Sequence, residues 1–214
     1  MRTAAIVLGA ALAPAVAHAQ PSPADADCYA ALDAAGVSWK PAHRPGIALG
    51  VLVTGPIGGV TYASISDGHP ALVLDCSLVL SLALAGPYLT ALGIDHGEYS
   101  SAYQVRNVRG THHPSKHSYG LALDVHVWSG PDVGPLSVER DFEQGLGDDV
   151  DCIGQPLSGP GAILKVLECQ LVRSGLFFLV LNPDTDSDHY NHYHLEARAW
   201  RDRATLRSDK AALH

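Results

Sequence analysis

The chain has 214 residues, a formal net charge of -8, and 47% hydrophobic against 17% charged residues, a composition that excludes wholesale disorder. Its length suits one domain with at most a small appendage. The acidic balance lacks the basic footprint of a nucleic-acid binder, and past the N-terminus no apolar run has transmembrane length. Two counts remain to be explained, namely 12 histidines and 4 cysteines.

The N-terminus has the three parts of a secretory signal peptide. A positive Arg2 precedes a short apolar run, which ends in the small-x-small triplet Ala17-His18-Ala19. We therefore expect residues 1–19 to be a signal peptide cleaved after Ala19, followed by a flexible leader over residues 20–27. The protein is expected to be secreted or periplasmic, without an integral membrane segment.

The remaining chain mixes short strands with a few helices. Strands are expected where apolar or alternating runs are bounded by turn residues, at 47–54, 60–64, 71–74, 98–105, 120–128, 176–181 (a buried strand) and 190–197. Helices are expected at 27–35, 76–92 and 161–174, the second capped by Asp75 and kinked or split at Pro87. Because strands and helices do not alternate regularly, the fold class is α+β, with one domain over residues 28–200 and a C-terminal tail over 201–214.

Export makes the cysteines interpretable as two disulfides. The four are Cys28, Cys76, Cys152 and Cys169. Of the three possible pairings we favour Cys28–Cys76 and Cys152–Cys169, because each joins neighbouring segments. A cysteine zinc site would need close C-x-x-C pairs, which the sequence lacks.

Seven of the 12 histidines fall in two short windows, residues 111–126 and 188–196. From 121 to 127 the odd positions are all Leu or Val, so one face of this strand is core and the other carries Asp124 and His126. In the last strand His192, His194 and Glu196 likewise share a face. A core strand does not place polar groups in this way unless something binds them.

Zinc is the natural occupant of such a set. A catalytic zinc takes three protein ligands, histidine nitrogen or carboxylate oxygen, and keeps the fourth position for water. His117, Asp124 and one histidine of the His192-x-His194 pair would supply them from neighbouring strands, for one zinc per chain. The zinc would activate water and polarise a carbonyl, and this chemistry hydrolyses amides.

The pattern Ser115-x-His117-x-x-Gly120-x-Ala122-x-Asp124, with a later His-x-His, resembles the lysostaphin/D-alanyl-D-alanine metallopeptidase/hedgehog superfamily. Within it the chain looks most like the bacterial extensin-like C-terminal family. That likeness rests on Cys28, the Tyr103–Arg106 segment, the Ser115–Asp124 motif and Leu181-Asn182-Pro183 running into Asp188-His189-x-x-His192-x-His194. The resemblance implies a small antiparallel sheet flanked by helices, carrying a zinc bound by His117, Asp124 and His194.

The triplet His189-x-x-His192-x-His194 also resembles penicillin-insensitive murein endopeptidases. This resemblance implies that His192 is the general base or acid and that His189 stabilises the transition state. One departure concerns the D-alanyl-D-alanine carboxypeptidase branch, which has a Glu three residues before its last histidine ligand, where this chain has Asn191. Proton transfer would then fall to His192, and Glu196 would support the ligand from outside the metal's shell.

These features predict an exported, monomeric zinc metallopeptidase that hydrolyses amide bonds in peptidoglycan peptides or a similar cell-wall polymer, as a D,D-carboxypeptidase or an endopeptidase. Arg106 and Ser115 are the candidate substrate-binding residues. Arg106 or Arg109 would hold a carboxylate by a bidentate contact, with a loop salt bridge as the alternative. The competing functions are a non-catalytic, zinc-stabilised cell-wall binding module and a zinc carrier. Retention of His192 favours catalysis, because a structural zinc site is closed by a fourth protein ligand.

Overall fold

The computed structural model describes residues 23–66, 70–146 and 152–202. The expected signal peptide, the first residues of the expected leader and residues 203–214 of the expected tail lie outside these ranges. Within the ranges, we find no helix that combines the length and the apolar character needed to cross a membrane.

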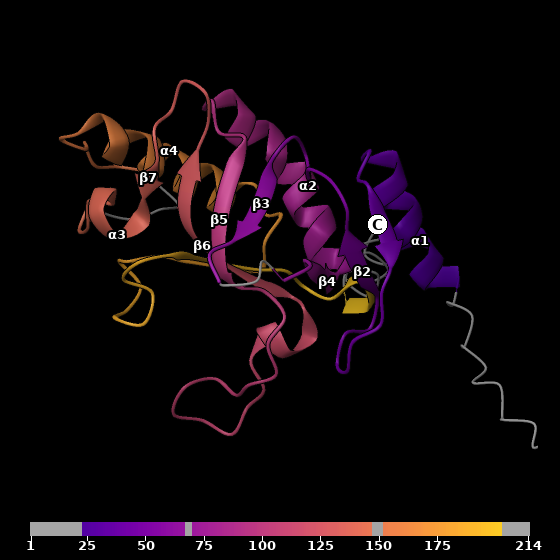
Figure 1. Cartoon of the computed structure of the whole chain (residues 1–214). Helices are drawn as coiled ribbons and strands as arrows, with labels where there is room; N and C mark the ends of the chain where they lie inside the picture. Colours follow the sequence, from indigo (N-terminus) through magenta and orange to yellow (C-terminus); the bar gives the residue numbers. More distant parts are fainter. Residues whose placement is uncertain (1–22, 67–69, 147–151, 203–214) are drawn as a thin grey trace, which may run out of the picture.

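The described residues form an α+β structure with two sheets (Figure 1). In chain order the elements are α1 (Pro23–Ala34), β1 (Trp39–Pro41), β2 (Gly50–Val53), β3 (Thr61–Ser64), β4 (Val73–Asp75), α2 (Cys76–Ala91), β5 (His96–Ser101), the 3-10 helix η1 (Lys116–Tyr119), β6 (Ala122–Ser129), β7 (Leu136–Ser137), α3 (Val138–Asp141), α4 (Gly159–Arg173), β8 (Leu179–Leu181) and β9 (Tyr193–Glu196).

The smaller sheet is antiparallel, with strand order β1-β2-β4. The larger sheet has the order β3-β5-β6-β9-β8, with β7 paired to the far end of β6. An antiparallel sheet was expected, but the observed sheet is mixed, because β3 runs parallel to β5. The chain between these two strands passes through β4 and α2, and such a crossover returns it to the same end of the sheet.

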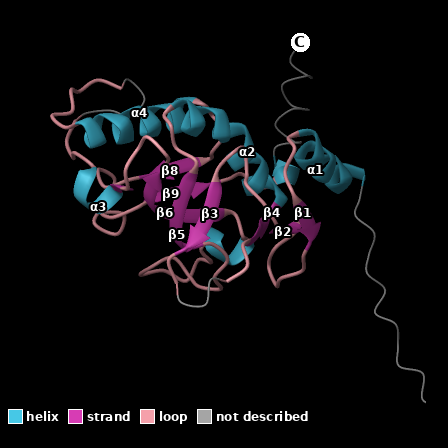
Figure 2. Cartoon of the chain, turned by 45° about the horizontal axis from the view of Figure 1, so that its top comes forward, coloured by secondary structure: helices cyan, strands magenta, loops and turns pink. Residues whose placement is uncertain are grey.

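Helix α2 begins where the sequence predicts, because Asp75 caps it. The Asp75 carboxylate accepts hydrogen bonds from the Ser77 N–H at 2.9 Å and from the Leu49 N–H at 3.0 Å, which also ties the helix to the start of β2. The helix continues past Pro87 to Ala91, so the expected split does not occur. Helices α2 and α4 lie together on one side of the larger sheet, and α1 lies beside the smaller one (Figure 2).

The apolar residues of the central strands are buried in the core. Leu123 and Val125 of β6, with Tyr193 and Leu195 of β9, are fully buried, and each burial of this kind contributes about 1.5–3 kcal/mol. The Tyr193 hydroxyl donates to the Leu164 carbonyl of α4 at 3.1 Å, which places this face against the helix. The opposite face of the same two strands is therefore left for polar residues.

The favoured cysteine pairing is present in the structure. Cys28 of α1 forms a disulfide with Cys76 at the start of α2. Cys152, which precedes α4, forms a disulfide with Cys169, which lies in α4. The second disulfide spans 17 residues and joins Cys152, in the segment between α3 and α4, to α4 itself. A loop of this length is expected to contribute about 3 kcal/mol to stability.

Several boundaries differ from expectation; the strand expected over 98–105, for example, is β5, which ends at Ser101. Helix α1 begins at Pro23, inside the segment expected as a leader, and proline is well tolerated in the first turn of a helix. A buried strand was expected over 176–181, but the observed strand β8 is shorter and covers only the last three of these residues. It is also not buried, because its Leu179 is 39% exposed. Strand β8 lies at the edge of the sheet and pairs with β9 alone, which explains its exposure.

Candidate metal centre

The register of β6 and β9 brings two of the expected ligands together. Asp124 and His194 are directly opposite each other in this antiparallel pair, so both side chains leave the same face of the sheet. The His194 Nδ1 lies 2.7 Å from the Asp124 Oδ1. Both residues are buried, with 5% and 9% exposure.

His117 reaches the same place from the 3-10 helix η1, not from a neighbouring strand as expected. The Ser115 hydroxyl caps η1 by accepting from the His117 N–H at 3.4 Å, and Gly120 ends it in the left-handed conformation, with φ of 64°. The ring of His117 is fully buried, and its Nε2 lies 3.1 Å from the Asp124 Oδ2. The predicted set of His117, Asp124 and His194 is thus one buried cluster, called the triad below.

The tautomer of His117 follows from the hydrogen-bond acceptor that its Nδ1 contacts. Its Nδ1 is 2.8 Å from the Ala102 carbonyl oxygen, which can only accept, so Nδ1 carries the proton in the neutral ring. The Nε2 then has a lone pair, is buried, and has no hydrogen-bond partner among the described residues. Such an unsatisfied buried atom costs about 1–3 kcal/mol unless a cation uses it. A backbone carbonyl behind the ring is also the usual support of a metal-binding histidine.

The geometry of the triad fits a divalent metal ion. Its ligand atoms all lie within 4.8 Å of one another, and its donors are two imidazole nitrogens and one carboxylate. The ring centres of His117 and His194 are 5.1 Å apart. With a metal–nitrogen distance of about 2.1 Å and tetrahedral angles, two coordinating imidazoles have centres about 5 Å apart. The triad could therefore hold a metal, and this donor set suits several divalent transition metals.

Charge within the triad also favours a cation. Burial raises the pKa of Asp124, but contacts with His117 and His194 outweigh it, and the net pKa lies well below its ordinary value. Burial lowers the pKa of His194, but the hydrogen bond with Asp124 and the nearby Glu196 carboxylate outweigh it and raise the pKa to about 9. The carboxylate thus stays ionised, and a metal ion must displace a proton from His194 when it binds.

Glu196 supports His194 from the side away from Asp124. It is buried, its Oε2 lies 3.8 Å from the His194 Nε2, and its Oε1 lies 3.5 Å from the Lys116 Nζ. Lys116 precedes His117 on η1, so this ion pair joins the ends of the two elements that carry the histidine ligands.

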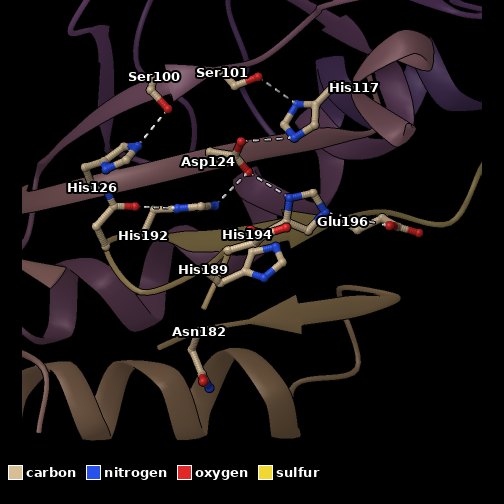
Figure 3. Close-up of polar contacts among 12 residues, drawn as sticks. Ser100, Ser101, His117, Asp124, His126, Asn182, His189, His192, His194 and Glu196 are labelled. Atoms are coloured by element: carbon tan, nitrogen blue, oxygen red, sulfur yellow. Dashed lines mark hydrogen bonds and ion pairs between the residues drawn. The ribbon is translucent and has the colours of Figure 1, made fainter. Parts of the chain in front are cut away.

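His192 and His189 lie beside the triad (Figure 3). His192 comes just before β9, and its Nε2 is 3.5 Å from the Asp124 Oδ1 while its Nδ1 is 2.9 Å from the Asn191 Oδ1. The His189 Nδ1 is 2.7 Å from the Asp186 Oδ1. Burial lowers the pKa of His192 to about 4; the Asp124 charge opposes this shift and the neighbouring histidines add to it. The His192 ring is therefore neutral at neutral pH.

His126 shares the face of Asp124 but is not placed as a ligand. Its Nε2 is 2.7 Å from the Ser100 hydroxyl, and it also makes a hydrogen bond with the Asn191 backbone. Its ring centre lies 5.1 Å from that of His192. His126 therefore holds the segment that carries His192 against β5 and β6.

The predicted substrate-binding residues have different surroundings. The Arg106 Nη2 is 3.8 Å from the Asp124 Oδ2, and its side chain is 40% exposed, so the structure brings it to the site. Ser115 is buried and its hydroxyl is used in the cap of η1. Arg109 forms a salt bridge with Asp188 at 2.6 Å, which is the alternative considered for it.

A cleft of about 750 Å³ opens over the triad. The residues that line it are Ser100, Ser101, Gln104, Arg106, Val108, Arg109, Pro114, Ser115, Lys116, Asp124, Leu179, Leu181, Asp186, Asp188, His189, His192, His194 and Glu196. Sequence reasoning missed Asp186 and Lys116 among them. The spacing of Asp186 and His189, three residues apart, was a signal that could have found the first, whereas the contact of Lys116 with Glu196 depends on the tertiary fold.

No protein-family model, curated protein or solved structure matches this chain.

Proposed function

We propose that this protein is an exported zinc metallopeptidase that hydrolyses amide bonds in peptidoglycan peptides. The observation that carries the proposal is the buried triad at the base of a cleft that also contains His192 and His189. Three protein ligands with an accessible side are the arrangement of catalytic zinc sites. The two disulfides are consistent with an extracytoplasmic location.

In this proposal His117, Asp124 and His194 hold the ion, which when bound supplies Lewis acidity and activates water. His192 is the general base and acid, because its neutral ring has an Nε2 lone pair on the cleft side and its Nδ1 is held by Asn191. It accepts a proton at Nε2 from the attacking water and returns it to the leaving amine. His189, held through Nδ1 by Asp186, stabilises the negative charge that develops on the carbonyl oxygen by donating from Nε2 when that nitrogen carries a proton.

The substrate class follows from the charges of the cleft. Its lining carries both charges, the basic side chains of Arg106, Arg109 and Lys116 and the carboxylates of Asp124, Asp186, Asp188 and Glu196, so it suits a polar peptide that carries charged groups, as peptidoglycan stem peptides do. Lys116 and Arg109 already face Glu196 and Asp188. Among the described residues the Arg106 guanidinium makes only the long contact with Asp124, and its other donors are left for a substrate carboxylate.

One observation favours the second candidate, a zinc-stabilised binding module. The His192 Nε2 is 3.5 Å from the Asp124 Oδ1, close enough for His192 to become a fourth ligand after a small ring movement. Four protein ligands would close the site and remove the position that catalysis needs.

Digestion of purified muropeptides distinguishes the two functions. Products are followed by mass spectrometry with wild-type chain, with chelator, and after zinc is returned, and Asp124→Asn serves as the metal-deficient control. The peptidase predicts new amine and carboxyl termini that disappear with chelator, return with zinc and are absent for Asp124→Asn. A chain that binds zinc and sediments with peptidoglycan, yet releases no product from any muropeptide, would replace the peptidase with the binding module.

A further inference from the structure

A second group of ligand atoms overlaps the triad on its more exposed side. His189, His192 and His194 each place a possible ligand nitrogen within 4.8 Å of the others. The side chains of His189 and His192 are 17% and 12% exposed and line the cleft, whereas the ring of His117 is fully buried. An ion that enters the cleft therefore meets His189, His192 and His194 before it reaches His117.

The rings of His189 and His192 are each oriented by a hydrogen-bond acceptor at Nδ1, as the rings of metal-binding histidines are. The His189 Nδ1 faces the Asp186 carboxylate at 2.7 Å, and the His192 Nδ1 faces the Asn191 side-chain oxygen at 2.9 Å. Each acceptor keeps the proton on Nδ1 and leaves a lone pair on Nε2. A carboxylate or amide oxygen behind the ring fixes its orientation and raises its strength as a ligand. His126 lacks this arrangement, because it is engaged by both Ser100 and the Asn191 backbone.

The spacing of the rings agrees with a shared ion. The ring centres of His189 and His192 are 5.1 Å apart, equal to the separation of His117 and His194 in the triad. Two imidazoles on one tetrahedral ion have centres about 5 Å apart, so His189 and His192 need little movement to share one.

We propose that His189 and His192 form a second metal site, the outer site, for a divalent transition metal such as Zn²⁺, Cu²⁺ or Ni²⁺. Imidazole nitrogen favours these ions over Mg²⁺ and Ca²⁺, which require oxygen ligands. When the triad holds its own ion, His194 is committed to it, and water completes the coordination of the outer ion. With fewer protein ligands, the outer ion binds more weakly than the ion of the triad.

The outer site has a regulatory consequence, which rests on the proposed function. An ion on the His192 Nε2 occupies the lone pair that accepts the proton, and it fills the cleft beside the triad. Excess zinc therefore inhibits hydrolysis, while the first zinc supports it.

The test counts ions rather than activity. Purified full-length chain is dialysed to equilibrium against increasing free Zn²⁺, and the zinc per chain is measured by elemental mass spectrometry. Wild type is expected to rise from about one ion to about two, and His189→Ala to stay at about one over the same range. His113→Ala, which removes an exposed histidine outside both groups, is the matched control and is expected to follow wild type. Retention of the first ion by His189→Ala shows that this variant has folded.

The outer site is overturned if wild type takes up no more than one ion, if His189→Ala still takes up two, or if His113→Ala loses the second. Ion uptake does not depend on hydrolysis. A chain that takes up two ions and cleaves nothing contradicts the peptidase alone, whereas a chain that cleaves muropeptides and takes up one ion contradicts the outer site alone.

Discussion

Two buried polar clusters of the described residues can be compared, and the triad is the one that lines the cleft described above. The triad places Asp124 against the rings of His117 and His194. The second cluster, between α4 and the segment after β8, consists of Lys165, Glu168 and Asn182, which are 6%, 0% and 1% exposed. In it Glu168 faces the Lys165 ammonium at 3.5 Å and accepts a hydrogen bond from the Asn182 amide.

The difference between the clusters lies in donor balance and access. In the second cluster a carboxylate meets a fixed cation and an amide, and the Asn182 Oδ1 accepts from the Asp184 N–H at 2.8 Å, which shapes the turn leading toward His189. In the triad the carboxylate meets imidazoles, which can act as metal ligands, and Asp124 and His194 line the cleft. Buried charge alone therefore does not mark a functional site; buried ligand atoms that border an open cleft do.

Removal of a triad ligand should have the largest effect. His117→Ala and Asp124→Ala, each combined with His189→Ala so that the outer site cannot take up the ion, leave the triad two ligands, so each variant should lose its zinc on dialysis and lose hydrolysis with it. Elemental analysis after dialysis measures the zinc. If both variants keep a full equivalent of zinc per chain, the triad is not the metal site and does not differ from the second cluster in this way.

His192→Ala should separate metal binding from catalysis. The variant keeps the triad, so it should retain zinc and fold, while the rate of muropeptide hydrolysis falls by about 10²–10⁴-fold because the general base is missing. Steady-state assays together with zinc content measure both effects. Loss of zinc from His192→Ala with retention by His194→Ala would exchange the roles of these two residues.

Glu168→Ala should act on stability instead. Removal of one partner of a buried ion pair leaves Lys165 uncompensated, and the expected cost is about 3–5 kcal/mol in the free energy of unfolding. Urea denaturation monitored by circular dichroism measures it, with exposed Glu139→Ala as a control expected to change stability by less than about 0.5 kcal/mol. Zinc content below the transition should be unchanged, and a folded Glu168→Ala without zinc would show that the two clusters are not separate in function.

Loss of the neighbouring disulfide should have the smallest of these effects. Cys169 follows Glu168 on α4, and replacement of both Cys152 and Cys169 by Ser removes a loop constraint that contributes about 3 kcal/mol. The same denaturation experiment measures it, and zinc binding should persist. A destabilisation larger than that of Glu168→Ala would show that the disulfide contributes more to stability than the buried ion pair of Glu168 does.

Local rules of the sequence predicted part of this arrangement. Asp75 before an apolar run predicted the start of α2, and alternation along 121–127 placed Asp124 opposite the core. The position of His117 on η1 could not be predicted in the same way, because Ser115 and Gly120 allow a single helical turn as readily as a strand end. The parallel pairing of β3 with β5 depends on a crossover, which local patterns do not specify.

The second cluster was missed for a similar reason. Leu164 and Leu167 follow the helical period of α4 and are buried in the core, whereas Lys165 and Glu168 lie beside that stripe. They are buried because Asn182 and the segment after β8 cover them, which is a contact between distant parts of the chain.

Crystallographic anomalous scattering at the zinc edge tests the central claim most directly. Crystals of the chain loaded with one equivalent of zinc should show a single peak within coordination distance, about 2.0–2.2 Å, of the His117 Nε2, an Asp124 oxygen and a nitrogen of His194. The same map shows whether the fourth position is open, as the peptidase requires, or filled by His192. A peak elsewhere, or zinc-loaded crystals with no peak at the triad, would contradict the assignment of these residues as a metal centre.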